Sequence, residues 1–280
     1  EEELLMPPES TFVRRLGAIA RDVDARRIRD GIARRVLDVP HLFAWHAPSR
    51  VARENRARIS RFRSRHAGER CFILGNGPSL SRMDLSRLRG EVTFGLNRIY
   101  LLFDRLGFTP TYFVCVNELV LEQFAADIRR LPMPKFLNWD RRSLFAGEDP
   151  STLFVRTRLG VGDGFGRDPA RSLSSGGTVT YVALQLAYFM GFHEVVLLGV
   201  DHSFADKGTP NRTERRDQAT DENHFHPEYF PKGSLWQLPD LPRSELAYGL
   251  ARDVFAREGR RIVDATVGGK CPVFEKVSFE

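Results

Sequence analysis

Seven short apolar runs alternate with helix-like stretches from residue 70 to the end of the chain. They cover residues 71–74, 92–96, 112–116, 135–137, 153–155, 194–198 and 261–263. This alternation is typical of parallel strands joined by crossover helices, and such strands read as continuous apolar runs because they are buried on both faces. The sequence therefore predicts an α/β fold with a Rossmann-like, doubly wound, mostly parallel sheet.

Short polar residues follow these runs, at the points where the predicted strands end. They are Asn76, Asn97, Asn117, Asn138, Asp201 and Asp264. One Asn at a strand end is an ordinary turn former. Several such residues at neighbouring strand ends predict the lining of a ligand pocket. Ligands of open α/β sheets bind outside the carboxyl ends of the strands. Amides both donate and accept hydrogen bonds, as a nucleobase edge or a ribose requires.

Two glycine-containing segments are candidates for phosphate contact. Gly75-Asn76-Gly77-Pro78-Ser79 follows the first predicted strand, and its glycines let the backbone approach a ligand closely. Ser174, Ser175 and Gly176 precede an apolar helix that begins near residue 179, where freed N–H groups and hydroxyls suit an anion. A plain strand-to-helix turn and a well-capped helix are the structural alternatives for the two segments.

A general base is predicted in a polar stretch at residues 206–234, which is long enough to be a lid. His224 or His226 would take the proton, with Asp221 or Glu222 orienting the imidazole. A simply exposed loop histidine is the alternative. No third ligand at convincing spacing accompanies the two histidines, so no metal site is predicted.

Several familiar activities are excluded by motif. The first glycine loop lacks the third glycine of a dinucleotide fingerprint, and Asn97 stands where an acid would bind ribose. No Walker-type phosphate loop and no zinc protease helix is present. Three cysteines, far apart in 280 residues, suggest neither disulfides nor a zinc cluster. No signal peptide or membrane span is visible, which predicts a soluble protein of the cytoplasm.

The positive charge is concentrated near the N-terminus. Residues 11–70 hold 16 arginines, no lysine and six acidic residues, in a pattern typical of amphipathic helices. We expect a basic helical extension over residues 1–68, followed by a nucleotide-sugar-binding catalytic domain over residues 69–280. The basic helices either pack on the main domain or attach to an anionic membrane surface through residues 11–38. Nucleic acid is not expected as a partner, and a homo-oligomer is left open.

The motifs together resemble a known group of enzymes. Their order along the chain is Ile73-Leu-Gly-Asn-Gly-Pro-Ser-Leu80, Met83-Asp-Leu-Ser-Arg-Leu88, Gly95-Leu-Asn97, Ser174-Ser-Gly176, Gly199-Val-Asp201 and Asn223-His-Phe225. This order resembles the bacterial sialyltransferases of glycosyltransferase family 42. It is also similar to a wider family that includes 6-hydroxymethylpterin diphosphokinases and motility accessory factors. Residues 264–274 look like the C-terminal motif of that wider family. The likeness covers roughly residues 70–277.

The resemblance implies an inverting transferase that uses a CMP-activated, sialic-acid-like sugar and needs no cofactor. His224 matches the histidine that deprotonates the acceptor hydroxyl in the family. The implied substrate-binding residues are Asn76, Gly77, Ser79, Asn97, Asn117, Ser174, Ser175, Gly176, Asp201 and His202. One departure leaves the stabiliser of the leaving group unassigned, because His202-Ser203-Phe204 replaces the expected tyrosines. His202, Tyr229 or an arginine are candidates.

Three functions therefore remain open. The first is a glycosyltransferase that acts on a glycan or protein acceptor in the synthesis of a bacterial surface glycan. The second is a 6-hydroxymethylpterin diphosphokinase-like enzyme, for which ATP and Mg²⁺ would be required. The third is a non-catalytic nucleotide-binding module.

Overall fold

The computed structural model describes residue 36 and residues 38–147, 149–158, 164–206 and 208–279. Its central feature is an eight-stranded sheet in which every neighbouring pair of strands is parallel. The strands are β1 (Arg70–Leu74), β2 (Thr93–Leu96), β3 (Tyr112–Cys115), β4 (Lys135–Asn138), β5 (Thr152–Val155), β8 (Glu194–Leu198), β11 (Arg261–Asp264) and β12 (Glu275–Lys276). The predicted Rossmann-like parallel sheet is confirmed, with the short β12 as an addition.

The spatial order of the strands is β12-β11-β8-β1-β2-β3-β4-β5. The chain starts at β1 in the middle, winds outward to β5, and then returns to the other side of β1 at β8. The two windings therefore diverge between β1 and β8, and the crevice beyond the carboxyl ends of these two strands is where such folds bind ligands. All four positions of β2, β3, β4 and β5 are buried, as strands covered on both faces require.

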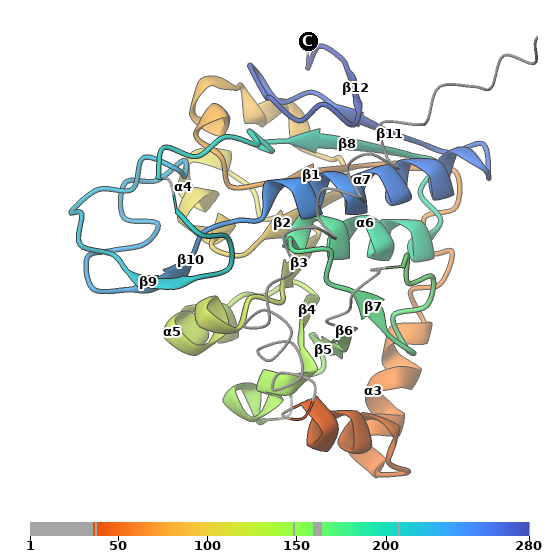
Figure 1. The fold of residues 1–280 in the computed structure, drawn as a ribbon. Coiled ribbons are helices and arrows are strands. Elements are labelled where there is room, and N and C mark those ends of the chain that lie inside the picture. Colours follow the sequence, from red (N-terminus) through yellow and green to blue (C-terminus); the bar gives the residue numbers. More distant parts are fainter. Residues whose placement is uncertain (1–35, 37, 148, 159–163, 207, 280) are drawn as a thin grey trace, which may run out of the picture. The chain divides into compact units, whose positions relative to one another are not determined.

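Helices cover the sheet and supply the rest of the core. The α-helices with defined bounds in the described part of the chain are α3 (Arg50–Ser60), α4 (Phe103–Leu106), α5 (Glu118–Arg129), α6 (Val179–Met190) and α7 (Leu241–Ala256). Helices α6 and α7 lie side by side over one face of the sheet (Figure 1). Helix α6 is buried at every position after Val179, in keeping with its apolar sequence.

Short elements connect the larger ones. Among the described residues, the 3₁₀ helices η1 (Pro78–Arg82), η3 (Ile99–Leu102) and η4 (Trp139–Phe145) follow strands of the sheet, and η2 (Leu85–Leu88) follows η1. The remaining strands form two small pairs, β6 (Thr157–Arg158) with β7 (Leu173–Ser174) and β9 (Thr213–Arg215) with β10 (Leu235–Gln237). The β9–β10 pair brackets the segment that contains His224.

Residues 48–280 form one compact unit, and the predicted boundary near residue 68 falls inside it. Helix α3 belongs to this unit because Asn55 binds the outermost strand. The Asn55 side chain donates to the Phe154 carbonyl and accepts from its N–H, both at 2.8 Å. Residues 38–46 are helical, whereas most of the predicted basic helix at residues 11–38 lies outside the described residues.

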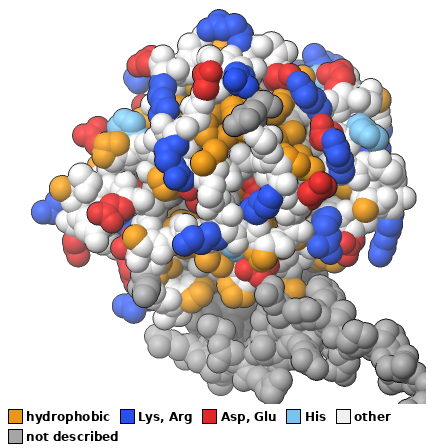
Figure 2. Space-filling model, turned by 90° about the horizontal axis from the view of Figure 1, so that it is seen from above, with side chains coloured by type: hydrophobic (Ala, Val, Ile, Leu, Met, Phe, Trp, Pro, Cys, Tyr) orange, Lys and Arg blue, Asp and Glu red, His pale blue; other side chains and the backbone are white. Residues whose placement is uncertain are grey.

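Basic and acidic side chains are interspersed on the face drawn in Figure 2, where an apolar area lies between them. Among the described residues, ion pairs join separate segments of the chain, such as Arg70 of β1 with Glu91 at 2.5 Å and Arg63 with Asp168 at 2.9 Å. Among the described residues, no helix is both long and apolar enough to cross a membrane.

Candidate functional site

The loop after β1 is hydrogen-bonded to the end of β8. Gly75 N–H donates to the Leu198 carbonyl at 2.7 Å, and Gly77 N–H donates to the Gly199 carbonyl at 2.9 Å. A Cβ on Gly75 would lie 2.3 Å from the Gly199 oxygen, and one on Gly77 would lie 1.8 Å from the Asp201 carboxylate. Both positions therefore need glycine for close packing, and the loop holds Asn76 at the crevice between β1 and β8.

Ser79 and Asp201 join the two sides of this crevice. The Ser79 hydroxyl donates to Asp201 Oδ2 at 2.6 Å, and its N–H donates to Oδ1 at 3.1 Å. Ser79 is fully buried and supports Asp201 instead of lining the pocket. Burial raises the pKa of the Asp201 carboxyl, although the Ser79 hydrogen bonds act in the opposite direction.

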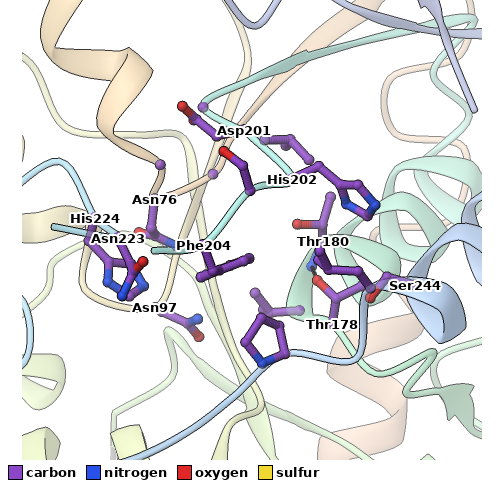
Figure 3. Close-up of a pocket in the computed structure, with 18 of the residues that line it drawn as sticks. Asn76, Asn97, Thr178, Thr180, Asp201, His202, Phe204, Asn223, His224 and Ser244 are labelled. Carbon is purple, nitrogen blue, oxygen red and sulfur yellow. Dashed lines mark hydrogen bonds between the residues drawn. The ribbon is translucent and has the colours of Figure 1, made fainter. Parts of the chain in front are cut away.

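A pocket opens at the carboxyl ends of β1, β2 and β8, as the strand order requires. Figure 3 shows one wall with Asn76, Asn97, Asn223 and His224, and another with Thr178, Thr180, His202 and Ser244. Of the residues predicted from sequence, the lining contains Asn76, Gly77, Asn97, Asp201, His202 and His224. The pocket therefore brings together predicted residues that are up to about half the chain apart.

Two amide oxygens in this pocket have no partner within the described part of the chain. Asn76 Oδ1 and Asn97 Oδ1 are buried and accept no hydrogen bond there. Asn97 also adopts the left-handed conformation with φ of 48°, which Asn tolerates better than most residues. Because a buried acceptor without a partner is costly, these oxygens suit a ligand that presents N–H or O–H donors.

The His224 ring is held by a carboxylate and by an aromatic ring. Its Nδ1 lies 2.9 Å from Asp221 Oδ2, and its ring stacks on Tyr229 with 3.9 Å between centroids and 3° between planes. Burial raises the pKa of Asp221, but His224, the Asn223 N–H and Arg216 together lower it, so the pKa lies below its usual range. A carboxylate accepts only, so Nδ1 carries the proton and Nε2 is the acceptor of the neutral ring.

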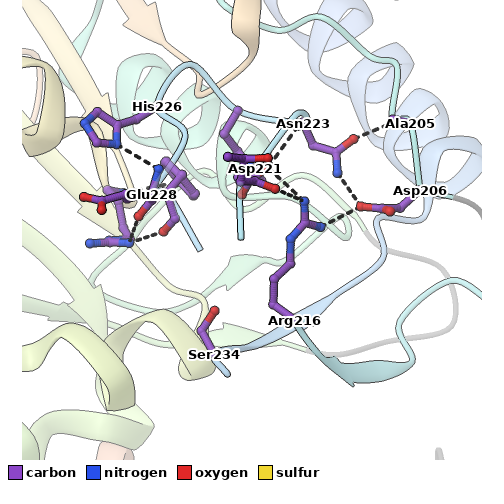
Figure 4. A network of polar contacts seen from close by, with 12 residues as sticks. Ala205, Asp206, Arg216, Asp221, Asn223, His226, Glu228 and Ser234 are labelled. Atoms are coloured by element: carbon purple, nitrogen blue, oxygen red, sulfur yellow. Dashed lines mark hydrogen bonds and ion pairs between the residues drawn. The ribbon is translucent and has the colours of Figure 1, made fainter. Parts of the chain in front are cut away.

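A buried network fixes this dyad (Figure 4). Arg216, which is almost fully buried, lies 2.6 Å from Asp206 Oδ2 and 3.6 Å from Asp221 Oδ1. Asn223 donates to Asp206 Oδ2 at 2.6 Å and accepts from the Ala205 N–H at 2.7 Å. The network connects the residues after β8 to the segment that carries His224.

Arg98 fixes the other side of the dyad. Its backbone N–H donates to the Tyr229 hydroxyl at 3.2 Å, and its guanidinium donates to the carbonyls of Glu228, at 3.0 Å, and of Tyr229. The guanidinium also lies over the Phe124 ring, 3.7 Å from its centroid. The ring under His224 is thus anchored to the end of β2.

The opposite wall is built by the starts of α6 and α7. Thr178 caps α6 by accepting from the Thr180 N–H at 3.3 Å. Burial raises the pKa of Tyr248 to about 12, so its hydroxyl stays protonated at neutral pH. Ser244 and Tyr248 of α7 line the pocket but were not predicted from the sequence. The sequence indicates them only as two polar residues one turn apart on a helix.

The other predicted substrate-binding residues, Asn117, Ser174, Ser175 and Gly176, do not line the pocket. Asn117 caps α5 by accepting from the Val120 N–H at 3.2 Å. Both backbone groups of Ser174 bind the Gln185 side chain, and a Cβ on Gly176 would lie 2.3 Å from the Tyr181 ring. Ser175 Oγ is buried without a partner among the described residues, outside the pocket lining.

The segment predicted as a lid packs its aromatic rings inward. Phe225, Tyr229, Phe230 and Trp236 are all buried. His226 is not a lining residue, and its Nδ1 accepts from the Glu228 N–H at 3.1 Å. Within the described part of the chain, no three His, Cys, Asp or Glu side chains are grouped so that they could hold a metal ion.

Comparison with known proteins identifies a family. The family described as 6-hydroxymethylpterin diphosphokinase MptE-like matches residues 50–207, more than half of the chain. The solved structure of MAf glycosyltransferase from Magnetospirillum magneticum AMB-1 is similar with a TM-score of 0.48 and 17% identity, over 80% of this chain and 38% of that one. The chain thus spans well under half of that structure. No curated protein matches. The resemblance to the diphosphokinase family is confirmed.

Proposed function

Because the chain belongs to the 6-hydroxymethylpterin diphosphokinase MptE-like family, we propose that it is a nucleotide-dependent transferase. Its proposed donor is a CMP-activated, sialic-acid-like sugar, and its acceptor is a hydroxyl of a glycan or protein. Such an enzyme would act in the cytoplasm, in the synthesis of a bacterial surface glycan. The residue-level resemblance to family 42 sialyltransferases supports the choice of donor.

The observation that carries this proposal is the His224–Asp221 dyad at the pocket wall. Asp221 accepts from Nδ1, so Nε2 is the atom that takes the proton of an acceptor hydroxyl. The oxygen of that hydroxyl then attacks the anomeric carbon as the bond to the phosphate breaks, which inverts the configuration. A pocket that only binds a nucleotide does not need such a base, so the dyad favours catalysis over a binding module.

The amide wall supports a nucleoside beside the dyad. The unpartnered oxygens of Asn76 and Asn97 suit the amino group of cytosine or the hydroxyls of ribose, which are donors. The opposite wall offers the hydroxyls of Thr178, Thr180 and Tyr248, and such donors suit a phosphate.

The family description favours a second function, transfer of diphosphate from ATP to a pterin hydroxyl. The same dyad could deprotonate that hydroxyl. The enzyme would require Mg²⁺, but Asp201 is the one carboxylate in the lining and both of its oxygens accept from Ser79. The residues of the described pocket therefore do not fit a metal held by the protein, and no step is assigned to it.

Calorimetric titration with CMP, CTP, ATP and UDP, each in EDTA and in Mg²⁺, tests the donor. We expect CMP to bind in EDTA. Asn97→Gly keeps the left-handed backbone, removes the amide, and should weaken CMP binding by about 1–3 kcal/mol. Binding of ATP alone, and only with Mg²⁺, would favour the diphosphokinase instead.

A further inference from the structure

A second histidine–carboxylate pair faces the first across the pocket. His202 follows β8 and Glu245 belongs to α7, and their side chains meet with 3.1 Å between Nε2 and Oε1. We propose that His202, held by Glu245, is the general acid of this site and donates through Nδ1 to the phosphate of the bound nucleotide. This inference rests on the proposed function and adds the acid that stabilises the leaving group.

The contact with Glu245 determines which ring nitrogen of His202 is available to a ligand. Since Glu245 occupies Nε2, only Nδ1 is left for a ligand. Among the described residues Nδ1 has no hydrogen-bond partner, yet it is not one of the fully buried unpartnered atoms. His202 itself lines the pocket beside Thr180 and Ser244, on the wall opposite His224 (Figure 3).

The backbone at His202 adopts an uncommon conformation, and its surroundings hold it there. Its φ of 55° lies in the left-handed region, which few non-glycine residues adopt, although His is among those found there more often. Upstream, Val200 N–H donates to Thr266 Oγ1 at 3.1 Å, and Lys270 N–H donates to the Asp201 carbonyl at 2.9 Å. The chain is thus pinned on both residues before His202, which turns the imidazole toward α7.

The charged and titratable groups that face the ring come from α7 and from its own segment. From α7, Glu245 contacts Nε2 and the Tyr248 ring lies 6.3 Å away between centroids. From its own segment, Asp201 precedes it, with the carboxylate turned to Ser79. A neutral imidazole that donates from Nε2 to a carboxylate can only accept at Nδ1, so a phosphate oxygen at Nδ1 requires the second proton.

Every proton of the sugar transfer has a donor and an acceptor. His224 Nε2 takes the proton of the acceptor hydroxyl, the acceptor oxygen bonds to the anomeric carbon, and the bond from that carbon to the phosphate oxygen breaks. His202 Nδ1 gives its proton to the departing phosphate oxygen, so CMP leaves protonated. His224 then returns a proton to solvent and His202 takes one back.

Proton uptake on binding of CMP tests this assignment without turnover. CMP is titrated calorimetrically at pH 8 in two buffers of different ionisation enthalpy, where phosphate and ordinary histidine are already deprotonated. We expect the full chain to take up on the order of half a proton or more per CMP. His202→Gln should abolish the uptake, Glu245→Gln should reduce it, and His224→Gln and His226→Gln should retain it.

The outcomes separate this inference from the proposed function. No uptake by the unaltered chain, or full uptake by His202→Gln, would overturn the assignment of His202. If His202→Gln binds no CMP, Glu245→Gln decides, and unchanged uptake in that variant counts against the pair. Uptake that depends on His202 without any sugar transfer would refute the proposed function alone. If neither CMP nor ATP binds, the assignment of the phosphate to the wall with Thr178, Thr180 and Tyr248 is wrong as well.

Discussion

His224 owes its position to residues from three parts of the chain. Asp221, three residues before it, fixes the tautomer, Tyr229 fixes the ring plane, and Arg98 after β2 anchors Tyr229. Each contact constrains a different degree of freedom of the imidazole. A ring held in this way gains little from further movement on substrate binding, which suits the proton transfer proposed for it.

Removal of this base should affect turnover and not donor binding. We expect His224→Ala to lower kcat by about 10² to 10⁴-fold, because the base acts in the transition state, and to leave CMP affinity nearly unchanged. Turnover is measured with a CMP-sugar and affinity by calorimetry. His226→Ala is the matched control and should be much milder, since His226 does not line the pocket. Retained transfer in His224→Ala would remove the base from the mechanism.

At the scale of elements, helix α3 completes the sheet where it would otherwise end. The outer strand β5 presents backbone groups with no further strand to bind, and Asn55 satisfies the N–H and the carbonyl of Phe154 at once. This side chain is fully buried. The helix therefore covers an edge that exposed strands leave open to other chains.

Asn55→Ala should destabilise the protein by about 2–4 kcal/mol, because two buried backbone groups lose their partner together. Urea unfolding monitored by circular dichroism measures the loss. Arg53→Ala, on an exposed position of the same helix, is the control and should change stability little. Equal stability of Asn55→Ala and the control would mean that water replaces the amide at this edge.

The basic segment at residues 11–38 remains a prediction about an element outside the described residues. Its arginines should bind anionic vesicles with an affinity that falls as salt rises. Co-sedimentation with phosphatidylserine vesicles at two salt concentrations measures this. Deletion of residues 1–40 should abolish sedimentation and leave CMP binding intact. A full chain that stays in the supernatant at low salt would favour a helix that is merely packed on the protein.

At the scale of the whole molecule, two carboxylates link stability to pH in the same direction. The pKa of Asp221 is lowered, as described above, and that of Asp149 is lowered too. Burial raises the Asp149 pKa, but hydrogen bonds from Lys135, Ser151 and Thr152 lower it well below its usual range. Both folded pKa values lie below the unfolded ones, so both groups stabilise the fold above about pH 4 and lose this effect as the pH falls.

Unfolding in urea should therefore show a midpoint that falls as the pH drops below about 4. Asp149→Asn should make the urea midpoint depend less on pH below about 4. It should also lower stability at pH 7, because Lys135 is fully buried and loses its charged partner. Asp201 opposes the trend slightly, since its pKa is raised and its contribution is lost as the pH rises. The same pH dependence of the urea midpoint in Asp149→Asn and in the unaltered chain would contradict this account.

The sequence alone determined the sheet and the loop after β1. Continuous apolar runs bounded by polar residues specify buried parallel strands, and the packing of Gly75 and Gly77 against β8 shows why glycine stands there. Asn76 and Asn97 were predicted from the strand ends, whereas His224 was preferred to His226 through the resemblance to family 42. These features depend on local patterns, which a single sequence displays directly.

Only the tertiary structure decided which strand ends meet. Asn97 and Asn117 look alike in sequence, yet Asn97 lines the pocket and Asn117 caps a helix. The reason is strand order, because β2 is next to β1 at the switch point whereas β3 is one strand further out. Glu245 and Tyr248 reach the site in the same way, because α7 docks beside α6 and brings their side chains to His202. Such contacts between distant segments leave no spacing in the sequence from which they could be predicted.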